Sequence, residues 1–428
     1  MVSLLLKKID VAVVGAGPAG LMAAIGVALA GRTVEVYEKN DIIGKKLLIT
    51  GKGRCNVTND CSVQDMVEAF APNGRFLYSA LHGFDVQDTM GFFEKLGVNL
   101  KVERGRRVFP SSDCAKDVRD AMVRYARKLG VVFSTDSAVQ NLKSEDGRVV
   151  GLVTKNGVYV DVGAVVVATG GASYPLTGST GDGYEMAKAF GHTIIDPLPA
   201  LVPLETREKW PCDLMGLALR NVELKLYDRE KLIGREFGEM MFTHFGVGGP
   251  TVLTLSRHIC STLRRNNGFS KDRFVLSLDL KPALDESVLD KRIQRDLTSA
   301  SKKHLKNSLD KLLPLNLIPY IVELSGVDPD VQANQISRAQ REALVHTLKD
   351  VRFHISATRP LSEAIVTSGG VKLSEVNSKD MGSKLVEGLY FAGEVLDIDA
   401  VTGGYNIQAA LSTGMLAGSS AASFVSQE

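Results

Sequence analysis

A glycine-rich turn close to the N-terminus constrains the fold of this chain more than any other feature. Residues 10–14 are predicted to form a short buried strand, and the turn Gly15-Ala16-Gly17-Pro18-Ala19-Gly20 follows it. We expect a helix over residues 21–30 and a second strand over residues 33–37 that ends at Glu38. This order of strand, turn, helix and strand indicates a βαβ unit, and hence a Rossmann-like α/β fold with a parallel sheet.

Each glycine of this turn has a physical role in a dinucleotide site. Gly15 allows the tight turn, Gly17 lets a pyrophosphate approach the backbone, and Gly20 lets the helix pack closely on the sheet. The N-terminus of the helix then faces the phosphates. Glu38 lies where an acidic side chain can accept hydrogen bonds from ribose hydroxyls. The pattern therefore predicts a dinucleotide-binding site.

A membrane-spanning helix is the alternative for the same segment, because residues 11–31 carry no charge. Glycines at positions 15, 17, 20, 26 and 31, together with Pro18, favour a strand, a turn and a helix over one continuous helix. We therefore expect no membrane association.

Two further segments indicate an extended cofactor. Residues 164–171 (AVVVATGG) are predicted to form a buried strand that ends at Thr169-Gly170-Gly171. Residues 389–417 contain a short strand, Gly393-Glu394, a turn at Gly403-Gly404 and an apolar helix. The apolar helix offers a second N-terminus to a ligand, far from the first in the sequence. Two such sites suit a long cofactor that is bound at both halves, and this favours FAD.

Several motifs resemble a known family. The first turn with Glu38, the ATGG of residues 168–171 and the AGE of residues 392–394 are similar to those of two-dinucleotide-binding-domain flavoproteins, in which the last motif usually has Asp in place of Glu394. Three longer blocks resemble the BaiN-like (YhiN-type) NAD(P)/FAD-dependent oxidoreductases: residues 51–59 (GKGRCNVTN), 241–250 (MFTHFGVGGP) and 403–409 (GGYNIQA). The resemblance runs essentially from end to end. It implies an FAD domain made from the two chain ends, and one type of member reduces carbon–carbon double bonds conjugated to a steroid ketone.

The expected organisation is an FAD-binding domain split by two inserts. The FAD-binding domain comprises residues 1–195 and 360–428, including an amphipathic helix over residues 114–128 and a hairpin over residues 137–153. A β-barrel-like insert is expected over residues 196–250 and 351–359, where proline and short strands dominate. Residues 251–350 are expected to form a mainly helical insert.

The patterns and the resemblance together predict one set of FAD-binding residues. The start of the last helix, at residues 405–410, is suited to place N–H groups against the flavin pyrimidine edge. Val139 is expected to touch the adenine. The full predicted set is Gly15, Ala16, Gly17, Pro18, Ala19, Gly20, Glu38, Lys39, Lys46, Gly53, Arg54, Asn56, Val139, Thr169, Gly170, Gly171, Gly393, Glu394, Asn406 and Ile407. We expect no metal site.

Two residues are candidates for catalysis. His244 lies beside Thr243 in a glycine-rich turn and is the predicted proton donor, with a structural histidine as the alternative. Arg54 is a cation in a glycine-rich loop, suited to phosphate or to the charge of a reduced flavin. A surface charge on that loop is the alternative.

Charge and cysteine content limit the other functions. The chain has 51 Lys and Arg against 49 Asp and Glu, which argues against a protein that holds polyanions over a broad surface. A basic stretch over residues 291–311 could contact RNA, but it has no interleaved aromatic residues, so a solvated helix face is favoured and no nucleic acid partner is expected. The odd number of cysteines, five, favours a reducing interior. A redox pair of Cys55 and Cys61 is the minor alternative to a Cys55 packed beside the cofactor.

The sequence thus predicts an FAD-dependent oxidoreductase that is reduced by NADH or NADPH as a transient partner. It is expected to transfer a hydride to an unsaturated or carbonyl-conjugated small molecule. The alternative is a flavin-binding redox sensor or an RNA-modification-related flavoprotein. An intracellular soluble location is expected, in the cytoplasm or in an organelle if a transit peptide precedes this sequence. The oligomeric state is left open.

Overall fold

The computed structural model describes residues 8–265 and 273–427, and the chain divides into two compact units. The first, which we call the sheet unit, extends to Ala200 and resumes at Leu361. The second, the barrel unit, comprises Leu201–Pro360. Each unit has its own cluster of buried apolar side chains. The sheet unit is therefore built from both ends of the sequence, which confirms the predicted split α/β fold.

The sheet unit is organised around seven strands in the order β6-β2-β1-β9-β8-β7, with β18 paired to β9. The strands β1, β2, β6, β9 and β18 are parallel to their neighbours in this group, and β7 and β8 form an antiparallel hairpin at the edge. Residues 11–14 of the central strand β1 are three valines and one alanine, all buried, which is the pattern of a strand covered on both faces. The bounds are Lys8–Val14 (β1), Val34–Tyr37 (β2), Val132–Ser134 (β6), Val139–Glu145 (β7), Arg148–Thr154 (β8), Tyr159–Val167 (β9) and Leu389–Phe391 (β18).

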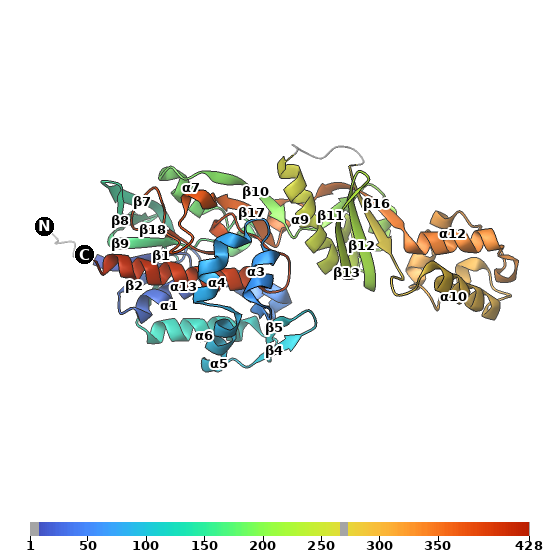
Figure 1. Ribbon diagram of the computed structural model, residues 1–428, viewed down its shortest axis with the longest axis horizontal. Coiled ribbons are helices and arrows are strands. Elements are labelled where there is room, and N and C mark those ends of the chain that lie inside the picture. The colour runs from blue at the N-terminus through green and yellow to red at the C-terminus, as the bar shows by residue number, and fades with distance from the viewer. Residues whose placement is uncertain (1–7, 266–272, 428) are drawn as a thin grey trace. The chain divides into compact units, whose positions relative to one another are not determined.

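Eight α-helices belong to the described part of the sheet unit, and two of them, α1 and α13, lie side by side (Figure 1). The first begins at Pro18, three residues earlier than predicted, because proline is well suited to the first helical position. Their bounds are Pro18–Leu29 (α1), Lys45–Ile49 (α2), Val63–Ala69 (α3), Tyr78–Gly83 (α4), Val86–Lys95 (α5), Ala115–Lys128 (α6), Asp182–Ala189 (α7) and Tyr405–Val425 (α13).

Glycines set the approach of α1 to α13. A Cβ atom at Gly414 would lie 2.3 Å from the Ala19 carbonyl oxygen, and one at Gly418 would lie 2.0 Å from that of Ala23. Both contacts advance by four residues in each helix, so the two helices run in the same direction. Since α13 begins nine residues before Gly414 and α1 only one residue before Ala19, the N-terminus of α13 extends about 12 Å beyond that of α1.

Two small sheets complete the sheet unit. The antiparallel pair of β10 (Ile194–Ala200) and β17 (Val366–Val371) joins the segments where the chain leaves the unit and returns to it. The second sheet has the order β3-β5-β4. Its strands are Thr58–Asn59 (β3), Leu100–Glu103 (β4) and Arg107–Pro110 (β5).

The barrel unit contains a closed barrel with the strand order β11-β14-β13-β12-β15-β16. Two of its strands are much longer than the short strands expected from the sequence, and β15 lies inside the range expected to be mainly helical. Closure of the barrel needs this strand, which bridges β12 and β16. The bounds are Leu204–Thr206 (β11), Ala218–Asp228 (β12), Lys231–Thr243 (β13), Gly246–Gly248 (β14), Phe274–Asp279 (β15) and Val351–Thr358 (β16).

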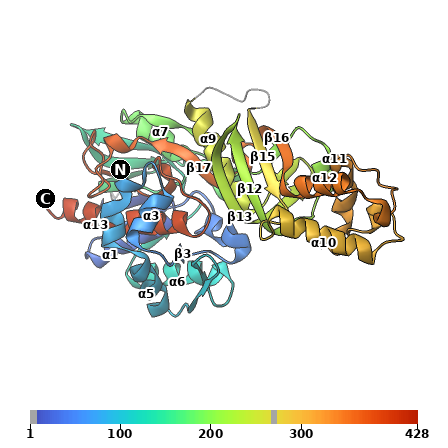
Figure 2. The same cartoon turned by 45° about the vertical axis from the view of Figure 1, so that its right-hand side comes forward.

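The described part of the barrel unit has a short helix, α8, next to β13 and β14, and four further helices. Helix α9 packs against β13, whereas α10, α11 and α12 gather beyond one end of the barrel (Figure 2). The bounds are Trp210–Asp213 (α8), Pro250–Arg265 (α9), Glu286–Ser299 (α10), Ile318–Ser325 (α11) and Arg338–Lys349 (α12). Across residues 8–265 and 273–427, no helix combines the length and apolar character needed to cross a bilayer.

Candidate cofactor-binding site

The turn between β1 and α1 has one glycine that faces open space. A Cβ at Gly15, whose φ is +100°, would lie 2.6 Å from the Ala168 carbonyl oxygen, and one at Gly20 would lie 1.9 Å from that of Gly15. These two glycines are needed for packing. At Gly17, in contrast, a Cβ would meet no atom of the described residues within 4 Å, and none of their side chains caps the helix. The start of α1 thus offers unpaired N–H groups and room for an anion.

Glu38 lies directly beside this turn. Its Oε2 accepts a hydrogen bond from the backbone N–H of Ala16 at 2.9 Å, and its Oε1 accepts two from Asn40. The backbone N–H of Ser137 donates to the Glu38 carbonyl, which brings the beginning of β7, with Val139, to the same edge of the sheet. The structure therefore brings together the glycine turn, Glu38 and Val139.

The segment after Thr169-Gly170-Gly171 crosses residues 39 and 40. Lys39 Nζ donates to Asp182 Oδ2 at 2.8 Å, and the Asn40 side-chain amide donates to the Thr177 carbonyl at 3.1 Å. The Lys39 charge is therefore paired with a carboxylate. The crossing places residues 177–182 next to Glu38.

A second cluster of contacts surrounds Glu394. Its Oε2 accepts a hydrogen bond from Lys46 Nζ at 2.8 Å, and its Oε1 accepts from the Thr367 backbone N–H at 2.8 Å and from Ser173 Oγ at 3.1 Å. Sequence reasoning missed Ser173 and Thr367. Ser173 follows the ATGG motif closely enough to have been included, but Thr367 lies in no recognisable motif.

We expect Glu394→Gln to lower the free energy of unfolding by about 1–2 kcal/mol, because the ion pair with Lys46 is lost and the remaining hydrogen bonds become neutral. The two side chains are 21% and 23% exposed, so solvent screens this pair only in part. Urea unfolding of the flavin-free protein measures the loss. The double variant Lys46→Met/Glu394→Gln should lose less than the sum of the two single variants, and strict additivity would contradict the pairing.

Within the described part of the chain, no side chain caps the N-terminus of α13 either. Its N-cap residue, Gly404, has φ +97°, and a Cβ there would lie 2.3 Å from the Thr58 carbonyl oxygen. Asn406 does not face outward from the helix: it exchanges hydrogen bonds with the backbone N–H and carbonyl of Ala400. Ile407 packs against the apolar core of the sheet unit. The first turn of α13 therefore presents backbone N–H groups in a position fixed by its side chains.

Buried Gln408 fixes this first turn to β3 and α5. Thr58 Oγ1 donates to Gln408 Oε1 at 2.6 Å, and Gln408 Nε2 donates to the carbonyls of Phe84 and Asp85. Gly393, two residues after the end of β18, donates its N–H to Thr413 Oγ1 of the same helix. The motif at residues 393–394 and the start of α13 thus form one connected cluster.

Residues 50–57, which we call the 50–57 loop, contain the predicted residues Gly53, Arg54 and Asn56. The Arg54 guanidinium donates to Glu103 Oε1 at 2.5 Å and to Asp113 Oδ1 at 2.7 Å. The contact with Arg54 lowers the pKa of the Glu103 carboxyl, and hydrogen bonds from Lys101 and then Arg54 lower the pKa of the Asp113 carboxyl. The two carboxylates in turn neutralise the arginine charge. Asn56 Oδ1 is buried and accepts no hydrogen bond from the described residues.

His244 lies in the barrel unit, in the turn between β13 and β14. Its ring meets that of Phe245 edge to face at a centroid distance of 4.7 Å. Thr243 Oγ1 beside it is buried and unpartnered within the described ranges. The role of His244 as a proton donor stays a prediction.

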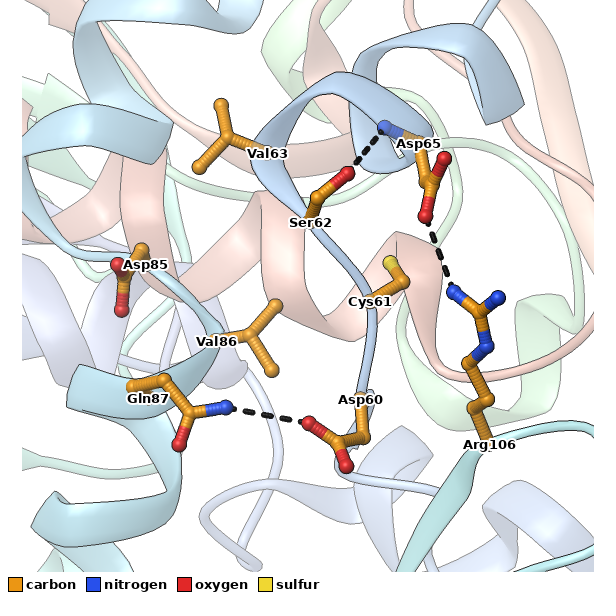
Figure 3. A pocket seen from close by; sticks show the side chains of 9 residues that line it. All are labelled: Asp60, Cys61, Ser62, Val63, Asp65, Asp85, Val86, Gln87 and Arg106. Atoms are coloured by element: carbon orange, nitrogen blue, oxygen red, sulfur yellow. Dashed lines mark hydrogen bonds and ion pairs between the residues drawn. The ribbon is translucent and has the colours of Figure 1, made fainter.

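A pocket of about 460 Å³ lies in the sheet unit, beside β3 and the starts of α3 and α5 (Figure 3). Asp60, Asp65 and Asp85 line it, and Arg106 is the single cation among the described residues that line it. Arg106 donates to Asp65 at 3.0 Å, and Gln87 donates to Asp60 at 3.1 Å. The excess of carboxylates makes this pocket unsuited to phosphate groups. Cys61 also lines it.

Cys55 and Cys61 are expected to be poor nucleophiles. Burial is the main cause that raises the pKa of the Cys55 thiol to about 12 and that of Cys61 to about 11. At pH 8, iodoacetamide should therefore spare Cys55 and react slowly with Cys61, since the thiolate is the reactive form. Peptide mass spectrometry measures this, with the guanidinium-unfolded protein as the fully reactive control. A disulfide between these two residues after mild oxidation would restore the redox-pair alternative.

Known proteins are similar to this chain over nearly its whole length. The sequence model described as HI0933-like protein Rossmann domain matches residues 9–420. The 3-dehydro-bile acid delta(4,6)-reductase of Clostridium scindens is 32% identical and aligns over 96% of this chain and 98% of that protein. The ribosomal RNA dihydrouridine synthase of Escherichia coli is 31% identical, over 95% of this chain and 96% of that protein.

Solved structures share the fold. A quinol-fumarate reductase with menaquinol molecules superposes with a TM-score of 0.54 at 19% identity, covering 98% of this chain and 72% of that chain. Such a low identity shows the likeness of the fold alone.

Proposed function

The chain belongs to the HI0933-like protein family, and from this membership we propose that it is an FAD-dependent oxidoreductase that saturates a carbon–carbon double bond conjugated to a carbonyl group. Membership agrees with the resemblance seen in the motifs. The names of the two relatives point to different substrates, a bile acid and ribosomal RNA. Both names nevertheless describe saturation of a ring double bond that is conjugated to a carbonyl group. We propose that the present chain also saturates a double bond of this kind.

The observation that carries the proposal is the pair of uncapped helix N-termini, which point in the same direction and are offset by about 12 Å. One of them opens onto the free space at Gly17. Partial positive charge at both ends suits a long cofactor with a pyrophosphate at one point and a ring that becomes negative on reduction at another. The buried, unpaired oxygen of Asn56 is a further group that a ligand is able to satisfy.

Three parts of the sheet unit are proposed to bind different parts of FAD. The start of α1 binds the pyrophosphate, Glu38 accepts hydrogen bonds from the ribose, and the first turn of α13 stabilises negative charge at the flavin pyrimidine edge. When bound, FAD supplies the two-electron hydride transfer. We propose NADH or NADPH as the reductant. The imidazole of His244 is the proposed source of the proton that the substrate carbon next to the carbonyl takes up.

A small molecule is the first candidate for the substrate, as predicted from the sequence. The basic stretch of the barrel unit is partly neutralised, since Arg292 pairs with Asp296 at 2.7 Å and Lys306 with Asp330 at 2.5 Å. Paired cations release few counterions on binding to RNA. Uridine in ribosomal RNA is the second candidate, because the relative from Escherichia coli is 31% identical to this chain.

Anaerobic spectroscopy of the purified protein tests the proposal. We expect flavin absorbance that is bleached by NADH or NADPH and that returns when a 3-oxo-4-ene steroid is added. Return with a uridine-containing ribosomal RNA transcript, and not with the steroid, would establish the second candidate. A protein without flavin contradicts the proposal. A reduced flavin that only oxygen reoxidises favours the redox-sensor alternative.

A further inference from the structure

Arg54 is fully occupied by other side chains of the sheet unit. Besides Glu103 and Asp113, its guanidinium lies 4.1 Å from the centroid of the Phe109 ring. Lys101 completes the group by donating to Asp113 at 2.7 Å. Two cations and two carboxylates leave no net charge for a phosphate or a reduced ring. The Arg54 guanidinium is therefore not available to balance the charge of a phosphate or of a reduced flavin, the role expected from the sequence.

The backbone that Arg54 belongs to is strained. In the 50–57 loop, Gly51, Lys52, Gly53 and Cys55 have φ values of +56°, +59°, +83° and +59°. The left-handed region is unfavourable for any residue with a Cβ, so Lys52 and Cys55 hold this conformation only because surrounding contacts impose it. Lys52 is exposed, and Cys55 is buried. A strained, imposed conformation is often found where a group has to be placed with precision.

Both ends of the 50–57 loop are fixed to the candidate cofactor site. On one side, Lys46 of α2 contacts Glu394. On the other, Thr58 contacts Gln408, and Asn59 donates to the Gly403 carbonyl at 3.0 Å. The 50–57 loop is therefore held at one end by Glu394 and at the other by Gly403 and Gln408, which all belong to the segment that leads into α13. Within it, the buried oxygen of Asn56 has no hydrogen-bond partner among the described residues.

We propose that Arg54 is a positioning residue that holds the 50–57 loop in its strained conformation and thereby places Asn56 for the cofactor. The guanidinium links the middle of the loop to Glu103 on β4 and to Asp113 through hydrogen bonds. It also packs over the ring of Phe109 on β5. Arg54 itself contacts neither cofactor nor substrate. This inference rests on the proposed FAD-binding function.

The test compares the FAD affinity of Arg54 variants with and without a substitution that relieves the backbone strain. In the flavin-free protein titrated with FAD, Arg54→Met should raise the dissociation constant about tenfold. Arg54→Lys should raise it less, because lysine keeps a charge that pairs with one carboxylate, although it cannot bridge both. Lys52→Gly removes the cost of the left-handed conformation, so the double variant Lys52→Gly/Arg54→Met should recover to within about threefold of the parent. Arg338→Met makes the same substitution at a more exposed ion pair of the barrel unit, Arg338–Glu342, and should leave the FAD affinity unchanged.

Unchanged FAD affinity of Arg54→Met would overturn the inference. If that variant also loses turnover and Lys52→Gly does not restore it, Arg54 is a catalytic residue instead. If the parent protein binds no FAD, the proposed function fails, and amide hydrogen exchange over residues 50–57 decides this inference separately. Faster exchange in Arg54→Met then supports positioning, and unchanged exchange contradicts it.

Discussion

Gly418→Ala is expected to destabilise the protein by about 3 kcal/mol, although it adds a single methyl group. The new Cβ would lie 2.0 Å from the Ala23 carbonyl oxygen, an atom of the backbone that no side-chain rotation moves away. Helices α1 and α13 have to separate to admit it. Because the first turns of both helices belong to the candidate cofactor site, FAD affinity should fall along with stability. Urea unfolding and FAD titration of the same preparation measure the two losses.

Gly91→Ala is the matched control for this change. Gly91 lies in the interior of α5, and a Cβ there would meet no atom within 4 Å. The same methyl group should therefore raise stability by about 0.5–1 kcal/mol, since alanine loses less backbone entropy than glycine in a helix. The two variants differ only in what the methyl group meets. A change of the same sign in both would contradict the packing of α1 against α13.

The glycines also show how far the sequence could predict the structure. The strand, turn and helix at residues 8–29 follow from local pattern, because Gly15, Gly17 and Gly20 mark the turn within a short stretch of sequence. Gly414 and Gly418 carry no such local signal. Their role depends on a helix almost 400 residues away in the sequence, and only the folded chain shows that Ala19 and Ala23 face them.

The same limit applies to the candidate site. Glu394 was predicted from its motif, but its partners Lys46, Ser173 and Thr367 come from three other segments. Arg54 was predicted as a cation suited to phosphate or to the charge of a reduced flavin, and the sequence does not show that Glu103 and Asp113 converge on it. Residue type and local spacing thus predict which groups are available. The pairing of charges is set by tertiary contacts, and it decides which groups remain free.

Gly17→Asp should separate folding from cofactor binding more sharply than any other substitution. Gly17 is the N-cap residue of α1, has the extended backbone typical of that position and faces open space. Aspartate is a favoured N-cap, and its charge suits the positive end of the helix, so the flavin-free protein should gain about 0.5 kcal/mol. The same carboxylate would occupy the place proposed for the pyrophosphate. Like charges about 4 Å apart near a protein surface repel by about 4 kcal/mol, so FAD affinity should fall about 1000-fold.

Gly17→Asn distinguishes charge from volume in this experiment. Asparagine caps a helix about as well as aspartate and has nearly the same size, but it carries no charge. Its loss of FAD affinity should therefore be much smaller, with a similar stability of the flavin-free protein. Equal losses in the two variants would mean that volume alone blocks the site. Retention of FAD by Gly17→Asp, measured by flavin absorbance after purification and by titration, would place the pyrophosphate away from α1 and remove the main support for the proposed site.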